Sequence, residues 1–284
     1  MPLRCLRALA TISVCLLSTG SHVHAQSEPD VGGAGRPLWE AGVAGFGLSG
    51  PAYPGASDTV NRALVLPWII YRGPILRADG GTVGARVMKT RDVEVDIGFA
   101  GALSARSRDV AVRQGMPDLG YLIEFGPRVR FNLARPSSDS LVRFDVPLRG
   151  VFELKDGLTY RGMAFEPRLS FDKRDIGAGW GLVASASLNF GDRKFNEYLY
   201  GVPSQFATPV RSAYQAKSGL ITPRMQLTVS RKLTEDVRFF GFTRLDFAGS
   251  GVNSDSPLHL KNSGASIGVG LVWTLGRSGE RAAD

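Results

Sequence analysis

Most of the chain alternates apolar with polar residues at a period of two, which is the pattern of a β-strand with one apolar and one polar face. Between Leu119 and Leu133 the odd positions are mostly apolar, whereas the even positions include Glu124 and Arg128. The same split recurs in one segment after another, so the sequence predicts an all-β fold. The segments predicted as strands are 39–48, 63–71, 75–80, 82–89, 92–103, 119–133, 140–153, 160–172, 178–190, 220–231, 236–248 and 264–275.

Several of these segments are longer than the strands of soluble sheets, which average about 5–6 residues. They suit a tilted strand that crosses a bilayer, which needs about 9–11 residues. Because lipid offers backbone groups no hydrogen-bond partner, a spanning sheet must close on itself with its apolar side chains outward. We therefore predict a closed antiparallel transmembrane β-barrel of about twelve strands, with ten possible. A soluble β-sandwich alternates in the same way and is the alternative.

The links between the predicted strands differ in length, as in outer-membrane barrels with short periplasmic turns and longer external loops. With the amino terminus in the periplasm, the short links around Pro136, Arg174 and Thr234 fall inside. The long links, which all fall outside, are 49–62, 104–118, 191–219 and 249–263.

Tryptophans at strand ends are typical of an aromatic girdle at the membrane interface. Four tryptophans lie in or beside predicted strands, although ordinary core packing explains each one equally well. They are Trp39, Trp68, Trp180 and Trp273.

The first residues have the three-part layout of a secretory signal peptide. Arg4 and Arg7 precede an apolar run that ends at Leu17, and small and polar residues follow as far as Ala25. The run is much shorter than the roughly 20 residues of a membrane-spanning helix. We expect cleavage after Ala25 and an outer-membrane location. The expected divisions are a signal peptide at 1–25, a periplasmic segment at 26–38, the barrel at 39–275 and a tail at 276–284.

Both cysteines, Cys5 and Cys15, lie in the segment that we expect to be removed. Lipoprotein processing at Cys15 is the alternative, but Val14 before it is not small. The remaining chain has no thiol for a disulfide, a zinc site or nucleophilic catalysis. The net charge of +8 is basic, but the basic residues alternate with carboxylates instead of forming a patch, so we expect no nucleic-acid partner.

The polar faces of the predicted strands balance carboxylates against guanidiniums, which favours ion pairs that fill the barrel interior. A selective channel would show one sign in excess, although a diffusion pore is the main rival because roughly twelve strands can enclose a lumen. The carboxylates are Glu94, Asp96, Glu124, Asp145, Glu153, Glu166, Asp172 and Asp246. The guanidiniums are Arg128, Arg130, Arg143, Arg149, Arg168, Arg224, Arg238 and Arg244.

The long link 191–219 mixes aromatic with basic residues, a composition that suits either an adhesive surface or a loop that folds inward and plugs its own barrel. Its candidate contact residues are Tyr198, Tyr200, Phe206 and Tyr214.

Catalytic residues are scarce. Once His22 and His24 leave with the signal peptide, His259 is the sole histidine, and it lies in a predicted external loop. A serine hydrolase needs a histidine base beside its nucleophile, so we expect no enzyme. The chain has no phosphate loop, dinucleotide fingerprint or metal-ligand cluster, so we expect no cofactor and no metal.

Three stretches carry a family resemblance: SGPAYPGASD from Ser49 with LPWIIYRG after it, GMPDLGYLIEFGPRVRFNLA from Gly115, and KFNEYLYGVPSQFATPVRSAYQAKSGL from Lys194. In this order and spacing they resemble the MipA/OmpV family of outer-membrane proteins, whose name records interaction with the murein hydrolase MltA. The resemblance implies a non-enzymatic scaffold that brings a lytic transglycosylase and a murein synthase together at the outer membrane. A small-solute pore and a surface adhesin are the alternatives.

Overall fold

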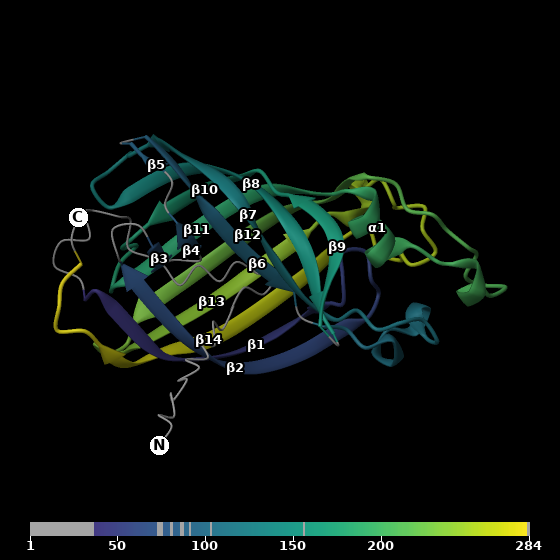
Figure 1. Ribbon diagram of the computed structural model, residues 1–284, viewed down its shortest axis with the longest axis horizontal. Coiled ribbons are helices and arrows are strands. Elements are labelled where there is room, and N and C mark those ends of the chain that lie inside the picture. The colour runs from purple at the N-terminus through teal and green to yellow at the C-terminus, as the bar shows by residue number, and fades with distance from the viewer. Residues whose placement is uncertain are drawn as a thin grey trace, which may run out of the picture.

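A β-barrel whose strands run along the longest dimension of the molecule makes up most of the chain (Figure 1). The structure is a computed structural model that describes residues 37–72, 76–79, 82–85, 88–90, 92–102, 104–155 and 157–282. The expected signal peptide and most of the expected periplasmic segment lie outside these residues.

The wall is one sheet built from consecutive strands of the chain. The strands are β1 (Trp39–Pro51), β2 (Thr59–Arg72), β3 (Leu76–Asp79), β4 (Thr82–Ala85), β5 (Met88–Lys89), β6 (Val93–Ala102), β7 (Tyr121–Ala134), β8 (Ser140–Leu154), β9 (Leu158–Phe165), β10 (Arg168–Lys173), β11 (Trp180–Gly191), β12 (Gly219–Lys232), β13 (Val237–Asp246) and β14 (Gly264–Arg277).

Two pairs of these segments share one position in the wall. β9 and β10 both pair with β8 on one side and with β11 on the other. β4 and β5 both pair with β6. The described strands therefore occupy twelve positions, the number predicted from the sequence.

The strands pair with their neighbours antiparallel, and the last strand returns to the first. β14 pairs with β1 from Glu40 opposite Arg277 to Ser49 opposite Ile267. β8 pairs with β10, which links the two ends of the strand order. These pairings close the ring, so the predicted closed antiparallel barrel is confirmed.

The outer face of the wall is apolar. Alternate residues along the strands are large, apolar and exposed to the outside, as in β14, where 61% of the surface of both Ile267 and Leu275 is exposed. Aromatic rings also pair on this face, for example Phe125 and Phe152 with their centroids 4.9 Å apart. Water would make such a surface costly, whereas the hydrocarbon of a bilayer matches it.

Two side chains differ from the predicted pattern. Trp68 pairs across β1 with Gly42 on the inward face, so it cannot belong to an outer aromatic girdle. Alternation within the predicted strand 220–231 puts Ile221 on the same outer face as Met225, but Ile221 is buried among loop residues, because a register shift between Asn189 and Phe190 alters the pairing at that end of β12.

The four long links all leave the same end of the barrel, as predicted, and we call this end the loop end (Figure 1). The last of them contains the short 3-10 turn Ala248–Ser250, and the others contain 3-10 turns at Ser107–Asp109, Ala111–Arg113 and Ser204–Phe206 and the helix α1 (Arg193–Tyr200). Short turns such as residues 135–139 and 233–236 join the strands at the opposite end, the turn end.

Helix α1 begins at Asp192, whose carboxylate accepts a hydrogen bond from the Phe195 N–H over 2.8 Å. This capping fixes the first turn of the helix. The cap sits against Gly162 of β9, which has a φ of +121°. A side chain on Gly162 would collide with Asp192, so this glycine lets the helix approach the wall.

Near the turn end the two ends of the described chain lie together. The Leu38 N–H donates to the Glu280 carbonyl over 2.8 Å, and Pro37 pairs with Arg281. β14 continues to Arg277, two residues past the predicted strand end at Leu275. Among the described residues, no helix has both the length and the hydropathy needed to cross a membrane.

Candidate functional site

The barrel interior has a continuous layer of ion pairs on one side. We call it the charged wall: the inward faces of β6 to β12, with Arg244 and Asp246 of β13. Alternation places the charged residues inward because their neighbours in each strand face lipid. Apart from Arg238 of β13, the residues proposed above for ion pairs in the lumen lie here, each with a partner of opposite charge.

Strands β6, β7 and β8 hold the first group. Arg128 donates two hydrogen bonds to Asp96, from Nε to Oδ1 over 2.9 Å and from Nη2 to Oδ2 over 2.8 Å. Arg130 donates from Nε to Asp145 over 3.1 Å and also lies 3.6 Å from Glu94. Asp96 is 1% exposed. A carboxylate this buried is tolerated only because the bidentate guanidinium replaces its hydration.

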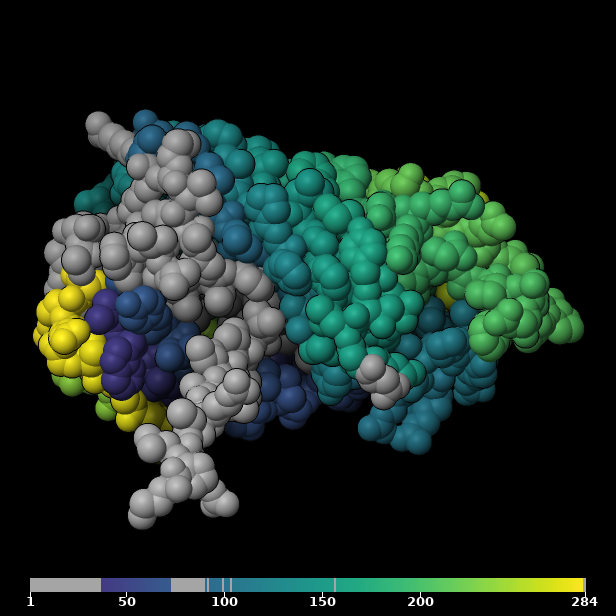
Figure 2. All heavy atoms as spheres, in the orientation of Figure 1, coloured from purple at the N-terminus to yellow at the C-terminus, as the bar shows by residue number. Residues whose placement is uncertain are grey.

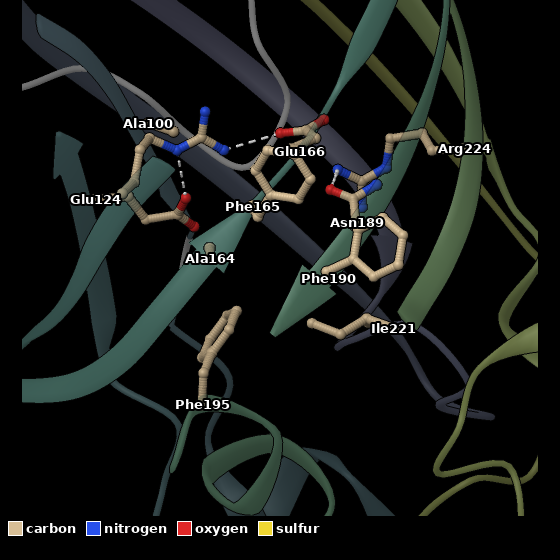
Figure 3. A pocket seen from close by; sticks show the side chains of 11 residues that line it. Ala100, Glu124, Ala164, Phe165, Glu166, Asn189, Phe190, Phe195, Ile221 and Arg224 are labelled. Carbon is tan, nitrogen blue, oxygen red and sulfur yellow. Dashed lines mark hydrogen bonds and ion pairs between the residues drawn. The ribbon is translucent and has the colours of Figure 1, made fainter. Parts of the chain in front are cut away.

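A second group is centred on Arg149 of β8, which lies between Glu124 and Glu166; Figure 3 labels these two glutamates. Its Nε donates to Glu124 and its Nη2 to Glu166, each over 2.9 Å. Glu166 also accepts from Arg168 over 2.6 Å and from the Ser187 hydroxyl over 3.1 Å. One guanidinium thus joins three neighbouring strand positions of the wall.

The remaining pairs extend the network along and across the wall. Arg143 donates to Asp172 over 3.0 Å. Arg224 and Arg244 both contact Asp246, at 2.7 and 3.1 Å. The Arg143–Asp172 and Arg224–Asp246 pairs join neighbouring strands and are cross-strand contacts of the kind that stabilise sheets, whereas Arg244 and Asp246 lie two positions apart on β13.

A cavity of about 50 Å³ remains beside Glu124, Glu166 and Arg224. In Figure 3 the ring of Phe195, from α1, faces it from the side opposite the ion pairs. A space of this size holds only a few water molecules. The ion pairs and the Phe195 ring therefore leave little space at this point of the charged wall.

The other side of the interior is apolar along its middle, with charged side chains toward its ends, where Glu40 pairs with Arg72 over 3.0 Å and Arg62 bonds to the Ser104 carbonyl. We call it the apolar wall: the inward faces of β14, β1 and β2, with Phe240 and Phe242 of β13. One cross-strand row runs from Phe240 through Gly270 and Phe46 to Leu64. A side chain on Gly270 would collide with both phenylalanines, so the glycine makes room for the rings. Alternation predicted a polar lining all around the ring, and the apolar wall shows that this prediction was wrong for β14, β1 and β2.

The long links pack together over the loop end, around a cluster that we call the loop core. Its buried members from the links include Tyr53, Val110, Leu199, Tyr200 and Leu258. Hydrogen bonds join different links: the Tyr53 hydroxyl donates to the Leu258 carbonyl over 2.8 Å, and the Tyr200 hydroxyl to the Pro54 carbonyl over 2.7 Å. The loops thus form a folded cap on the barrel (Figure 2).

Burial changes the acidity of these tyrosines. Burial, opposed by the Arg113 guanidinium, raises the pKa of Tyr53 to about 12. Burial and the neighbouring Tyr53 raise the pKa of Tyr200 well above its ordinary value. Both hydroxyls therefore keep the protons that they donate to backbone carbonyls at neutral pH.

The four aromatic residues proposed for external contacts all take part in the cap. Tyr200 is 2% exposed, and Phe206 packs against the loop core. Tyr198 donates to Glu153 over 2.9 Å, which ties α1 to the charged wall. Tyr214 donates to Asn253 over 3.1 Å, in a different link. These rings hold the loops together instead of forming an exposed adhesive patch.

Sequence reasoning missed three features of this interior. Arg161, not any of the proposed arginines, pairs with Glu153. Arg211 joins two links through hydrogen bonds to the Val112 and Gln114 carbonyls over 2.7 and 3.0 Å. The apolar wall was missed as well, although one signal was present, since residues 63–71 do not alternate and read as a continuous apolar run.

Comparison with known proteins gives a family and several distant structural likenesses. The family model described as "MltA-interacting protein MipA" matches residues 43–275. None of the curated protein sequences matches the chain.

Solved structures with some likeness include three outer-membrane proteins. Outer membrane phospholipase A from Escherichia coli is 8% identical with a TM-score of 0.35, over 82% of this chain and 92% of that one. Outer-membrane expressed OmpT of Vibrio cholerae is 9% identical with a TM-score of 0.32, over 84% and 98%. A Pseudomonas aeruginosa FadL homologue is 8% identical with a TM-score of 0.33, over 91% and 98%. Scores this low bear on neither activity nor partner.

Proposed function

The chain belongs to the family of MltA-interacting protein MipA, and from this premise we propose that it is a non-enzymatic outer-membrane barrel that holds murein enzymes. A lytic transglycosylase is the first partner, and a murein synthase the second. The observation that carries the proposal is that one side of the interior is lined by buried ion pairs beneath a packed loop cap. A barrel of this kind offers surfaces for partners rather than a path for solutes.

The charged wall weighs against the pore alternative. Its carboxylates and guanidiniums are paired with each other, and the cavity beside Glu124, Glu166 and Arg224 has room for only a few waters. We expect no steady open current when the purified protein is inserted into planar bilayers. A stable conductance of constant size would favour the pore instead.

The single histidine of the described chain also supports a role without catalysis. His259 lies beside Gly55 at the loop end, and its Nε2 has no hydrogen-bond partner within the described residues. A histidine base of a hydrolase would contact the hydroxyl that it activates. We expect His259→Ala to leave any envelope phenotype of the parent unchanged.

The orientation of the barrel in the outer membrane decides which of its ends a murein enzyme could contact. We place the turn end in the periplasm, because its connections are short. Two apolar side chains are exposed on these turns, Ile176 at 52% and Leu233 at 53%. Murein and its enzymes lie on that side of the outer membrane, so these turns are the natural contact surface.

The proposal is tested by capture of a purified lytic transglycosylase of the MltA type on the barrel in nanodiscs. We expect Ile176→Asp with Leu233→Asp to weaken capture at least tenfold. Val210→Asp is the matched control, because Val210 is 93% exposed but lies in a link at the loop end. Equal capture by all three proteins, or loss with Val210→Asp alone, would contradict the proposed surface. Absence of capture by the parent would contradict the scaffold role itself.

A further inference from the structure

Between Ala63 and Tyr71, strand β2 is apolar on both of its faces, unlike the strands of the charged wall. Val65 and Ile69 point outward and are 73% and 56% exposed. Leu64, Leu66 and Trp68 point inward, yet they are only half-buried. Apolar residues on both faces are typical of a strand with apolar surroundings on both faces. The inner face of β2 is thus a continuation, inside the barrel, of the surface that faces lipid.

Of the two edges of β2, the one that faces away from β1 pairs with a neighbouring strand at few residues. β2 pairs with β1 along its whole length, but with β3 only at Tyr71 and Arg72. On the far side of β3 and β4, β6 pairs with β4 and β5 only at Gly98, Val95 and Glu94. Among the residues that the structure describes, no strand therefore pairs with β2 between Ala63 and Ile70.

This unpaired stretch is bounded at both ends. At the loop end the Arg62 Nε donates to the Ser104 carbonyl over 2.9 Å, across to the segment that follows β6. At the turn end the pairing with β3 closes the wall. Figure 1 shows β3 and β4 at the end of the barrel that is opposite α1.

The indole Nε1 of Trp68, on the inner face of β2, is buried and has no hydrogen-bond partner within the described chain. A pure hydrocarbon would leave this donor unsatisfied. The fitting ligand has a long apolar chain for Leu64, Leu66 and Phe46, and oxygen atoms that accept from N–H groups.

We propose that the inner face of β2 binds an acyl chain of a bilayer phospholipid, which enters beside the unpaired edge, with ester oxygens near Trp68. The lipid comes from the periplasmic leaflet, because Trp68 lies toward the turn end of β2. The charged wall opposite offers no such surface, since ion pairs cover it. This inference goes beyond the scaffold role and does not depend on it.

Tryptophan fluorescence in bilayers of phospholipid with brominated acyl chains tests the proposal, because bromine quenches only at short range. In the full chain with Trp39→Phe, Trp180→Phe and Trp273→Phe, Trp68 is the only emitter. We expect quenching at least half as strong as for a variant that keeps only the outward Trp273. The matched control replaces all four tryptophans with phenylalanine and carries Gln226→Trp, on an inward position of β12 whose two edges are paired. This emitter should resist quenching.

A second variant and an aqueous quencher complete the test. Leu64→Asn with Leu66→Asn, in the Trp68-only chain, should reduce quenching by brominated lipid at least twofold while heat-dependent gel migration stays that of a folded barrel. Quenching of Trp68 by aqueous iodide instead of brominated lipid would show a water-filled interior and overturn the proposal. Resistance to both quenchers would overturn it too, because protein would then cover this face.

Discussion

The two walls of the barrel interior achieve burial by opposite means. The charged wall buries carboxylates and guanidiniums in matched pairs, and Arg149 alone contacts Glu124 and Glu166 over 2.9 Å. The apolar wall packs phenylalanine rings over glycines, as Phe240 and Phe46 do over Gly270. The charged wall is stable only if every ion-pair partner is present, whereas the apolar wall is stable only if the rings fit over the glycines. One closed sheet can therefore be lined by two chemistries, provided that each is complete within its own strands.

The largest effect is expected where one member of a network is removed. Arg149→Met leaves Glu124 and Glu166 buried without their shared guanidinium, which should lower the free energy of unfolding by about 3–5 kcal/mol. Reversible urea unfolding in lipid vesicles measures it. Arg135→Met, at an exposed arginine of a turn, is the control and should change little. Equal stability of the parent and Arg149→Met would mean that the charged wall is not held by its pairs.

The apolar wall should instead be destabilised by added side-chain volume. Gly270→Ala places a methyl group against Phe240, Phe46 and the Gly45 carbonyl. Overpacking of this kind costs about 1–3 kcal/mol. Gly45→Ala is the matched control on the outer face, where the nearest atom is Val65 Cγ2 at 3.7 Å. Both variants are compared by the same unfolding assay, and a tolerated Gly270→Ala would argue against close packing of the rings.

A double substitution tests whether an ion pair of the charged wall can be replaced by apolar side chains, as on the apolar wall. Arg143 and Asp172 form a pair at 3.0 Å. Arg143→Met with Asp172→Leu removes both charges together, so stability should stay within about 1 kcal/mol of the parent. Arg143→Met alone leaves the Asp172 carboxylate buried without its guanidinium and should lower the free energy of unfolding by more than the double substitution does. A double variant less stable than the single one would show that the charged wall needs its charges for more than mutual compensation.

The smallest effect concerns the loop core, which covers the ends of both walls. The pKa of Tyr53 is raised from 10.0 to about 12. Because the folded value lies above the unfolded one, this contribution to stability is complete below about pH 10 and is lost as the pH rises through about 12. Loop proteolysis should accelerate across that window, while the far-UV signal of the barrel stays constant.

Tyr53→Phe serves as the control for this pH dependence, since it removes the titrating hydroxyl and its bond to the Leu258 carbonyl. The variant should be cleaved somewhat faster at neutral pH and show a weaker rise toward pH 12. Cleavage rates that do not change with pH in either protein would contradict the role given to the tyrosine.

Alternation predicted the fold and the charged wall well because a period of two assigns each residue to a face without knowledge of its neighbours. The strand predicted at 119–133 is observed at Tyr121–Ala134. The ion pairs follow, since Glu124 and Arg149 had to face the same interior. Which carboxylate meets which guanidinium depends on register, however, and Arg161 was not foreseen as the partner of Glu153.

The apolar wall and the cap were beyond the reach of local patterns. β2 is apolar on both faces, so alternation cannot tell which way Trp68 points. The bond from Tyr53 to Leu258 joins residues 205 positions apart. Such contacts depend on closure of the ring and on the folding of the links, which no short window of sequence contains.

The division of the interior into two walls is tested most directly by spin labels at three single-cysteine positions in bilayers, with oxygen and a water-soluble nickel chelate as relaxing agents. The natural cysteines lie only at positions 5 and 15. We predict that labels at Leu188, facing outward, and at Leu66, on the apolar wall, meet oxygen far more than nickel. A label at Gln226, on the charged wall, should show no such preference for oxygen. If the Leu66 label behaves like the Gln226 label, the two walls are alike and the account is wrong.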